Sequence, residues 1–247
     1  MTDLLQNSPT SERPRRRRGP LIVVGVVVLL AAALLVAYLA FFRGSSEERI
    51  TLSPSEPNPS GSAVTAESAA GQWVATTGSE AGYRVREKLS RLPAQSDAVG
   101  RTTAVSGGMS VVASGDRLVA RDLRMEVDVS KLQSDEARRD NRIRTDGLET
   151  NRFPTATFVS TGEIVVPSDA VSGRAFRADV TGDLTIHGVT KRVTIPVEAR
   201  LDGPTLQVVG SYKFPMSDFA INPPNIGGFV TVDPDATLEF KILMTKG

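Results

Sequence analysis

The 247-residue sequence contains no cysteine and a single histidine, His187. Without thiols, the chain can form no disulfide and no cysteine-ligated zinc or iron–sulfur centre, and one imidazole cannot serve a site that needs two. The GxSxG and HExxH motifs of common hydrolases are also missing. We therefore expect a protein that is not an enzyme and that carries no metal and no cofactor.

The charge balance argues against nucleic acid as a partner. The formal net charge is +1, and residues 71–247 carry equal numbers of basic and acidic side chains. A duplex-binding domain normally concentrates Lys and Arg on one surface to neutralise phosphates.

Residues 21–42 form an uncharged apolar run, LIVVGVVVLLAAALLVAYLAFF, and a bilayer-spanning helix needs roughly 20 such residues. Residues 1–20 carry five arginines, and basic flanks stay on the cytoplasmic side. We predict a basic cytoplasmic tail, a single-pass helix in the cell membrane and an extracytoplasmic C-terminal part. A cleaved signal peptide is the alternative, although Phe41 and Phe42 stand where cleavage needs small residues.

Residues 43–70 are dominated by Ser, Pro, Gly, Glu and Ala, a composition typical of a flexible linker. Such a linker spans roughly 30 Å on average, which would keep the following domain near the membrane. The folded domain is expected to occupy residues 71–247.

From residue 71 onward, apolar and polar side chains alternate with the two-residue period of strands that have one wet face. The pattern predicts about eight strands, at 83–89, 119–129, 176–186, 193–201, 206–214 and 238–244, with weaker ones around 102–112 and 155–161. Antiparallel strands of this kind hide their apolar faces in a two-sheet sandwich or a closed barrel.

Two stretches interrupt the alternation. Ser134 followed by Asp135 and Glu136 resembles the start of a helix that runs to about Arg144, and its low apolar content places it on a rim. The Pro- and Gly-rich stretch 215–235 is too long for a hairpin turn, which leaves either a functional loop or a disordered connection.

Several inward positions of the predicted strands hold small residues. They leave space for a ligand inside an eight-stranded barrel, or they relieve crowding where strands bend. These positions are Ala178, Gly182, Ala199 and Gly210, together with Ala104 and Gly108.

Two polar groups stand out. His187 follows a strong strand in GDLTIHGVTK, where His-Gly reads as a turn, so the imidazole either recognises a ligand or caps the turn. Glu87 falls on the apolar side of its strand, and a buried carboxylate needs a partner. Arg138, Arg139 and Asp140 are candidates to pair with it or to close a barrel mouth. Either role, a structural ion pair or ligand recognition, is open.

Five segments in order, RRDNRIR, NRFPTATFVST, GDLTIHGVTKRVTIPVEARL, FPMSDFAI and TLEFKILMTK, resemble the YceI-like family over residues 71–247. The resemblance implies an all-β, antiparallel, eight-stranded lipocalin-like barrel that encloses a long isoprenoid chain, such as an isoprenoid quinone. The first strand, GYRVREKL, departs from the family pattern because it lacks a histidine that many relatives carry there. The matching motif positions are Arg139, Asp140, Phe153, Pro154, Phe158, Gly182, Asp183, Leu184, His187, Gly188, Asp218 and Phe219.

The leading hypothesis is a membrane-anchored extracytoplasmic protein that holds or carries an isoprenoid lipid, a polyisoprenoid or an isoprenoid quinone. The alternatives are a cell-envelope interaction module with a filled barrel, and a hydrolase or isomerase that uses His187 and Glu87. The predicted lipid-contacting residues are Tyr83, Val85, Glu87, Arg139, Phe153, Phe158, Leu184, Ile186, His187 and Phe219.

Overall fold

A computed structural model describes residues 47–54, 65–89, 95–114, 117–223, 225–226 and 230–247. The chain divides into two units, Met1–Ser45 and Ser46–Gly247, and the predicted tail and membrane helix at 1–42 lie outside the described residues. In the described ranges, no helix combines the length and the apolar character needed to cross a bilayer.

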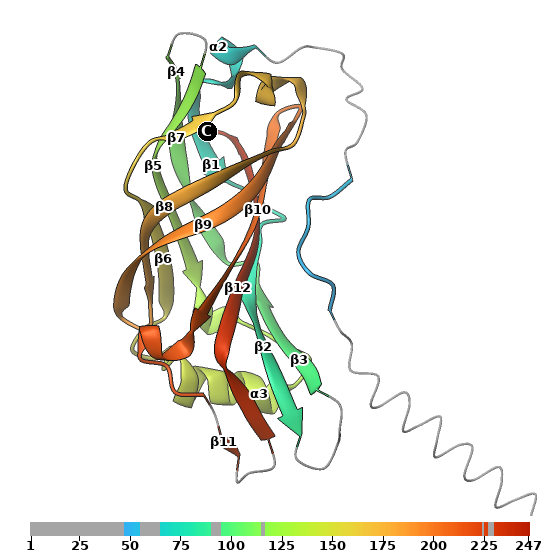
Figure 1. Cartoon of the computed structure of the whole chain (residues 1–247), viewed down its shortest axis with the longest axis vertical. Coiled ribbons are helices and arrows are strands. Elements are labelled where there is room, and N and C mark those ends of the chain that lie inside the picture. Colours follow the sequence, from blue (N-terminus) through green and yellow to red (C-terminus); the bar gives the residue numbers. More distant parts are fainter. Residues whose placement is uncertain (1–46, 55–64, 90–94, 115–116, 224, 227–229) are drawn as a thin grey trace, which may run out of the picture. The chain divides into compact units, whose positions relative to one another are not determined.

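The second unit is built mainly of antiparallel strands (Figure 1). The strands are β1 (Gly71–Ala75), β2 (Glu80–Leu89), β3 (Gln95–Thr102), β4 (Val105–Ser114), β5 (Arg117–Asp128), β6 (Thr155–Ser160), β7 (Ile164–Val166), β8 (Phe176–Ile186), β9 (Val189–Asp202), β10 (Thr205–Pro215), β11 (Asn225–Ile226) and β12 (Val230–Lys246). Short helical segments are α2 (Ala66–Ala69), η1 (Val129–Lys131), α3 (Ala137–Arg142), η2 (Ile143–Gly147), η3 (Ser168–Ser172) and η4 (Met216–Phe219).

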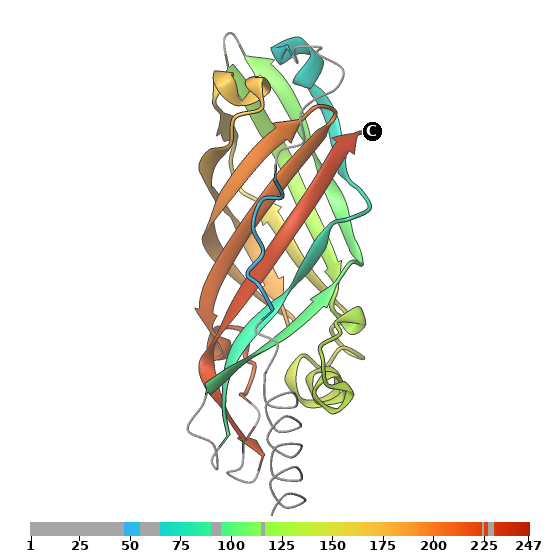
Figure 2. The same ribbon diagram turned by 90° about the vertical axis from the view of Figure 1, so that its right-hand side faces the viewer.

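Eight strands close into a ring in the order β1-β4-β5-β6-β8-β9-β10-β12, and β12 pairs back to β1. The long strand β12 makes this closure possible because its two halves have different neighbours. Met244–Lys246 pair with β1, whereas Val230–Lys241 pair with β2. The predicted eight-stranded antiparallel barrel is therefore confirmed, and the sandwich alternative is wrong (Figure 2).

All eight predicted strands are present, but the closed ring uses a different set. β1 belongs to the ring, whereas β2 extends the wall beyond β1 along β12 and carries β3 at its outer side. After β5, η1 contacts β3 and β6, and Gln133 forms a bridge with Arg101. The chain between β5 and β6 thus fills the space between β3 and β6 at the lower end of the barrel in Figure 1.

The predicted rim helix is present as α3, followed by the single π-helical turn η2. Its N-cap is Glu136 and not Ser134, because the Glu136 side chain accepts a hydrogen bond from the Arg138 amide. Ser134 instead donates to Asp140 through its hydroxyl, at 2.6 Å, and through its amide, at 2.9 Å. Both bonds reach Oδ1 of the buried Asp140 carboxylate.

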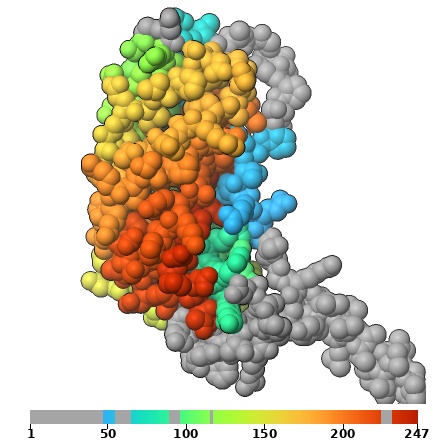
Figure 3. Space-filling view, in the orientation of Figure 1, coloured from blue at the N-terminus to red at the C-terminus, as the bar shows by residue number. Residues whose placement is uncertain are grey.

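Part of the expected linker lies on the barrel. Residues 47–54 run in extended form over the outer face of β2, β12 and β10 (Figures 2 and 3). Barrel side chains form hydrogen bonds with the backbone of this segment. Arg84 donates to the Glu47 carbonyl at 3.0 Å, and Arg101 donates to the Glu48 carbonyl at 2.7 Å. Arg200 donates to the Ser53 carbonyl at 2.6 Å, and Gln207 accepts from the Ser53 amide at 2.5 Å. Further along, Ala69 of α2 accepts a hydrogen bond from the indole of Trp73, at 2.9 Å. Both pieces precede the expected domain boundary at residue 71.

Beneath this segment lies a buried ion pair on the outer face of the barrel. Arg84 Nε lies 2.8 Å from Glu239 Oε1, and the two side chains are only 7% and 4% exposed. Asp97 adds a second carboxylate to Arg84, and Arg101 approaches Glu239 at 3.9 Å. Because outward charges normally face water, their burial shows how closely residues 47–54 cover this face.

We expect Arg84→Met to destabilise the barrel by about 3 kcal/mol, since it leaves the Glu239 carboxylate buried with less compensation. The double variant Arg84→Met/Glu239→Leu removes both charges, and it should recover most of that loss. Urea unfolding measures the two changes, and equal destabilisation in both variants would contradict this account.

The inward glycines do not leave empty space. A Cβ added to Gly182 would lie 2.5 Å from Phe158 Cζ, and one added to Gly210 would lie 2.5 Å from Phe240 Cζ. At Gly100, which no pattern singled out, the ring and hydroxyl of Tyr83 lie within 2.7 Å of such a Cβ. At these glycines an aromatic ring from a neighbouring strand occupies the place of the missing Cβ, which favours the crowding interpretation.

Gly210→Ala is expected to cost about 1–3 kcal/mol because the new methyl group displaces the Phe240 ring in a packed wall. Gly162→Ala is the matched control, since a Cβ there has no neighbour within 4 Å. Thermal unfolding of both variants is the measurement. Equal stability would show that the ring moves aside freely.

Candidate functional site

The barrel interior contains two apolar clusters, one toward each end. The lower cluster includes Leu184, Ile186 and Phe219, and the upper one includes Trp73 and Met109. The partly buried ring of Phe240 packs against both clusters. Phe240 therefore marks the middle of the interior.

Between Leu206 and Val209 of β10, burial is the reverse of what a solid barrel predicts, whereas further along the strand the inward Phe214 is buried and the outward Ser211 and Lys213 are exposed. The outward-facing Gln207 and Val209 are each only 6% exposed, on the face that residues 47–54 cover. The inward Leu206, Val208 and Tyr212, which pack against the clusters, are only partly buried. Inward side chains of a fully packed core would be buried on every side.

The predicted site residues gather at the barrel end that carries α3 (Figure 1). Leu184, Ile186 and Phe219 are buried inside the lower cluster, and Val85 and Phe158 pack against it while partly exposed. Three of the six apolar predictions thus occupy the core itself, and the other three, Val85, Phe153 and Phe158, retain surface that another molecule can contact.

Glu87 and Arg139 form the ion pair that the alternation pattern indicated. Arg139 Nε and Nη2 donate to the two Glu87 carboxylate oxygens at 3.3 and 3.2 Å. Arg139 also pairs with Asp135. Arg138 is exposed and Asp140 accepts from Ser134, so neither binds Glu87. The guanidinium of Arg139 is therefore balanced by two carboxylates.

Tyr83, two residues before Val85 on the same strand face, carries a hydroxyl oxygen that is buried without a hydrogen-bond partner. Burial raises the pKa of the Tyr83 hydroxyl well above its ordinary value, Arg139 opposes this, and Asp140 and Glu87 add to it. The group is thus held as a neutral hydrogen-bond donor.

The raised pKa gives a pH dependence with a definite sign. Above about pH 10 the unfolded chain ionises this tyrosine while the folded barrel does not, so stability falls with rising pH by up to about 1.4 kcal/mol per unit. Above pH 10, the Tyr83→Phe variant should not show this fall in stability. Below pH 10, the stability of the variant and that of the wild type should depend on pH in the same way. Urea unfolding across that range measures the difference, and parallel curves throughout would contradict the assignment.

His187 occupies the tight turn between β8 and β9. His187 and Gly188 have φ values of 52° and 73°, as expected for a two-residue turn with both residues left-handed, and Ile186 pairs with Val189 across it. His187 Nδ1 lies 3.1 Å from the Phe219 carbonyl, and the Phe153 ring meets the imidazole edge-on at 4.8 Å. The predicted turn is confirmed, and the histidine connects it to the segments that carry Phe219 and Phe153.

The remaining imidazole nitrogen, Nε2, is buried without a hydrogen bond and lies 3.4 Å from Glu149 Oε1. The pKa of the Glu149 carboxyl lies below its ordinary value. The main cause is the hydrogen bond that Arg152 donates to it, and the nearby His187 imidazole lowers the pKa to a smaller extent. The carboxylate is therefore engaged mainly by Arg152, and it lies slightly too far from His187 for a good hydrogen bond. In the described ranges, His, Asp and Glu side chains form no group of three that could hold a metal ion.

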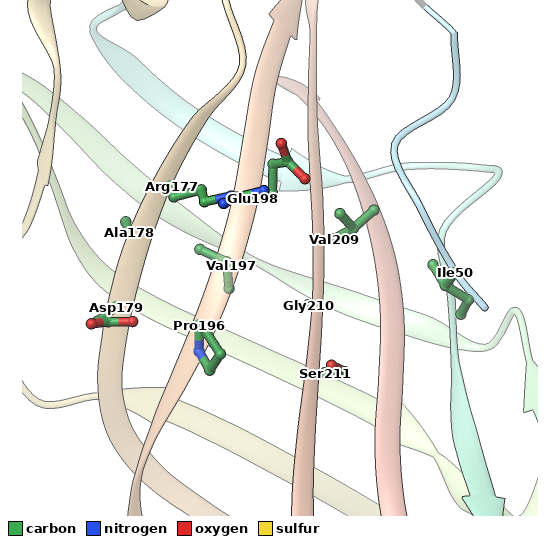
Figure 4. A pocket seen from close by; sticks show the side chains of 10 residues that line it. All are labelled: Ile50, Arg177, Ala178, Asp179, Pro196, Val197, Glu198, Val209, Gly210 and Ser211. Carbon is green, nitrogen blue, oxygen red and sulfur yellow. The ribbon is translucent and has the colours of Figure 1, made fainter.

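A pocket of about 300 Å³ lies on the opposite side of the wall from the predicted site, where residues 47–54 border β9 and β10 (Figure 4). Its residues come from β8, β9, β10 and the covering segment, and the sequence patterns did not indicate it. They are Ile50, Arg177, Ala178, Asp179, Pro196, Val197, Glu198, Val209, Gly210 and Ser211.

These features define a closed β-barrel domain with apolar side chains toward its interior and a charge-balanced polar group at one end. The YceI-like domain model matches residues 73–244, so the chain belongs to the YceI-like family, as predicted. A UPF0312 protein of Vibrio vulnificus is 34% identical over 147 residues, which are 57% of this chain and 72% of that protein. Protein YceI of Shigella flexneri is 36% identical over 85 residues, 34% of this chain and 39% of that protein.

Two solved structures share the fold. One is a polyisoprenoid-binding domain from Saccharophagus degradans, with a TM-score of 0.55 and 18% identity over 72% of this chain and 99% of that domain. The other is the YceI protein of Campylobacter jejuni, with a TM-score of 0.51 and 17% identity over 65% of this chain and 91% of that protein. At these identities the likeness concerns the fold alone.

Proposed function

We propose that the barrel binds an isoprenoid lipid, with the tail between the inward side chains of β2, β10 and β12. The observation that carries the proposal is the incomplete burial of inward apolar residues, Val208, Tyr212 and Leu238 among them. The free energy falls when an apolar chain leaves water and covers this surface. The fold shared with a polyisoprenoid-binding domain supports the same function.

Burial alone supplies enough energy to hold such a lipid. At roughly 0.8 kcal/mol per buried CH₂ group, about 20 tail carbons contribute on the order of 16 kcal/mol before ordering costs are subtracted. No catalytic or metal-binding group is needed, and the protein is proposed to act as a carrier or holder and not as an enzyme.

The polar side chains near α3, Tyr83, Glu87 and Arg139, suit a lipid whose head group carries no charge. Arg139 is already balanced by Glu87 and Asp135, so an added phosphate would meet their negative charge. Tyr83 offers a protonated hydroxyl without a partner, which matches the carbonyl of a quinone. We therefore place an isoprenoid quinone ahead of a polyisoprenoid phosphate as the ligand.

Membrane anchoring through residues 21–42 is also proposed, with the barrel on the extracytoplasmic side. It rests on the length of the apolar run and on the arginines that precede it. A protein that handles lipids gains from staying beside the bilayer that contains them.

Mass spectrometry of organic extracts tests the lipid proposal. The full chain, purified and offered an isoprenoid quinone, should retain about one quinone per chain. Val208→Trp fills the interior and should abolish retention, whereas Val165→Trp, at an outward position that is 54% exposed, should not. A folded wild-type protein that stays empty, or equal retention in both variants, would overturn the proposal.

A further inference from the structure

The ring of paired strands is interrupted on one side. The β9–β10 ladder runs from Asp202 and Thr205 to Val197 and Gly210, and it ends there. Beyond this point residues 189–196 pair only with β8, and residues 211–215 pair only with β12. Figure 4 shows the two ribbons diverging below the last pair. We call this gap the β9–β10 seam.

A proline stands at the top of the seam. Pro196 is the first β9 residue past the ladder, and its nitrogen has no hydrogen to donate to a neighbouring strand. Proline inside a sheet is normally confined to positions where a strand edge is free. The sequence itself therefore ends the β9–β10 ladder at this point, although the Pro196 carbonyl oxygen still lies close to Gly210.

The outer pocket coincides with the top of the seam. Its lining includes outward residues, such as Glu198 and Ser211, and inward ones, Ala178 and Val197. The pocket thus lies against three successive residues of β9 and three of β10, on either side of the point where the ladder between them ends.

The lower part of the seam is closed and the upper part is thinly covered. Met216 and Phe219 of η4 pack with Val193 and Ile195 of β9 in the lower cluster, which seals the lower end. At the top, the inner side of Gly210 is covered by the ring of Phe240, which is only partly buried. The Phe240 ring, together with the Pro196 carbonyl oxygen 3.1 Å from a Cβ added at Gly210, thus stands between the pocket and the middle of the interior.

We propose that the top of the β9–β10 seam is the passage through which the isoprenoid tail enters the barrel. The inference rests on the proposed lipid-binding function and adds the site of entry. A flexible hydrocarbon chain suits the passage because it needs only a narrow opening lined by apolar surface, which Ile50, Pro196 and Val209 provide on the outer side. The Phe240 ring is the barrier that the tail displaces.

Closing the seam reversibly tests the proposal. Because the chain has no cysteine, Pro196→Cys/Ser211→Cys places the only two thiols across the top of the seam. The full chain in detergent micelles is mixed with an isoprenoid quinone, and entry is followed by quenching of Trp73, the single tryptophan, which lies in the upper cluster. We expect uptake to slow at least about tenfold on oxidation and to recover on reduction.

A second pair of variants covers the case in which the disulfide does not form. Ser211→Cys labelled with a bulky maleimide should slow quinone uptake, whereas Val165→Cys with the same label should not. Equal uptake rates in the oxidised and reduced forms, or with both labels, would overturn the seam as the entry point. If neither the wild-type protein nor any variant takes up quinone, the proposed lipid-binding function itself is wrong.

Discussion

The structure depends on the pairing of one long strand, β12, with four neighbours. β12 pairs with β10 and the short β11 along one edge, and with β1 and β2 in succession along the other. This arrangement closes the ring near the C-terminal end of β12 and leaves β2 and β3 to extend the wall at the opposite end. The inward faces of all these strands then enclose a shared interior, and the polar chain between β5 and β6 fills the remaining gap.

The alternation of apolar and polar residues was sufficient to predict the strands that have a regular inward face. It missed β1, β3, β7 and β11 because β1, β7 and β11 are short and β3, QSDAVGRT, contains few apolar residues. It could not choose between a ring and a sandwich, since that depends on which strand β12 pairs with. The resemblance to a known family made the choice, and the topology confirms it.

The polar predictions succeeded where a simple energetic rule applied. A carboxylate on an apolar face needs a cation, and Glu87 has Arg139. The location of residues 47–54 could not be predicted, because their composition resembles a linker and the hydrogen bonds that hold them to the barrel are made by their backbone atoms. The β9–β10 seam had one visible signal, Pro196 in the middle of a strongly alternating strand, but its meaning appears only when the ladder beside it is seen to end.

The central claim is that the lipid tail lies inside the barrel and not on its outer face. Methyl-resolved NMR with an isoprenoid quinone tests it most directly, through nuclear Overhauser effects between the tail and protein methyl groups. The account predicts contacts to the inward residues Val85, Val208 and Leu238. Contacts confined to outward residues such as Ile50, Val74 and Val165 would contradict it.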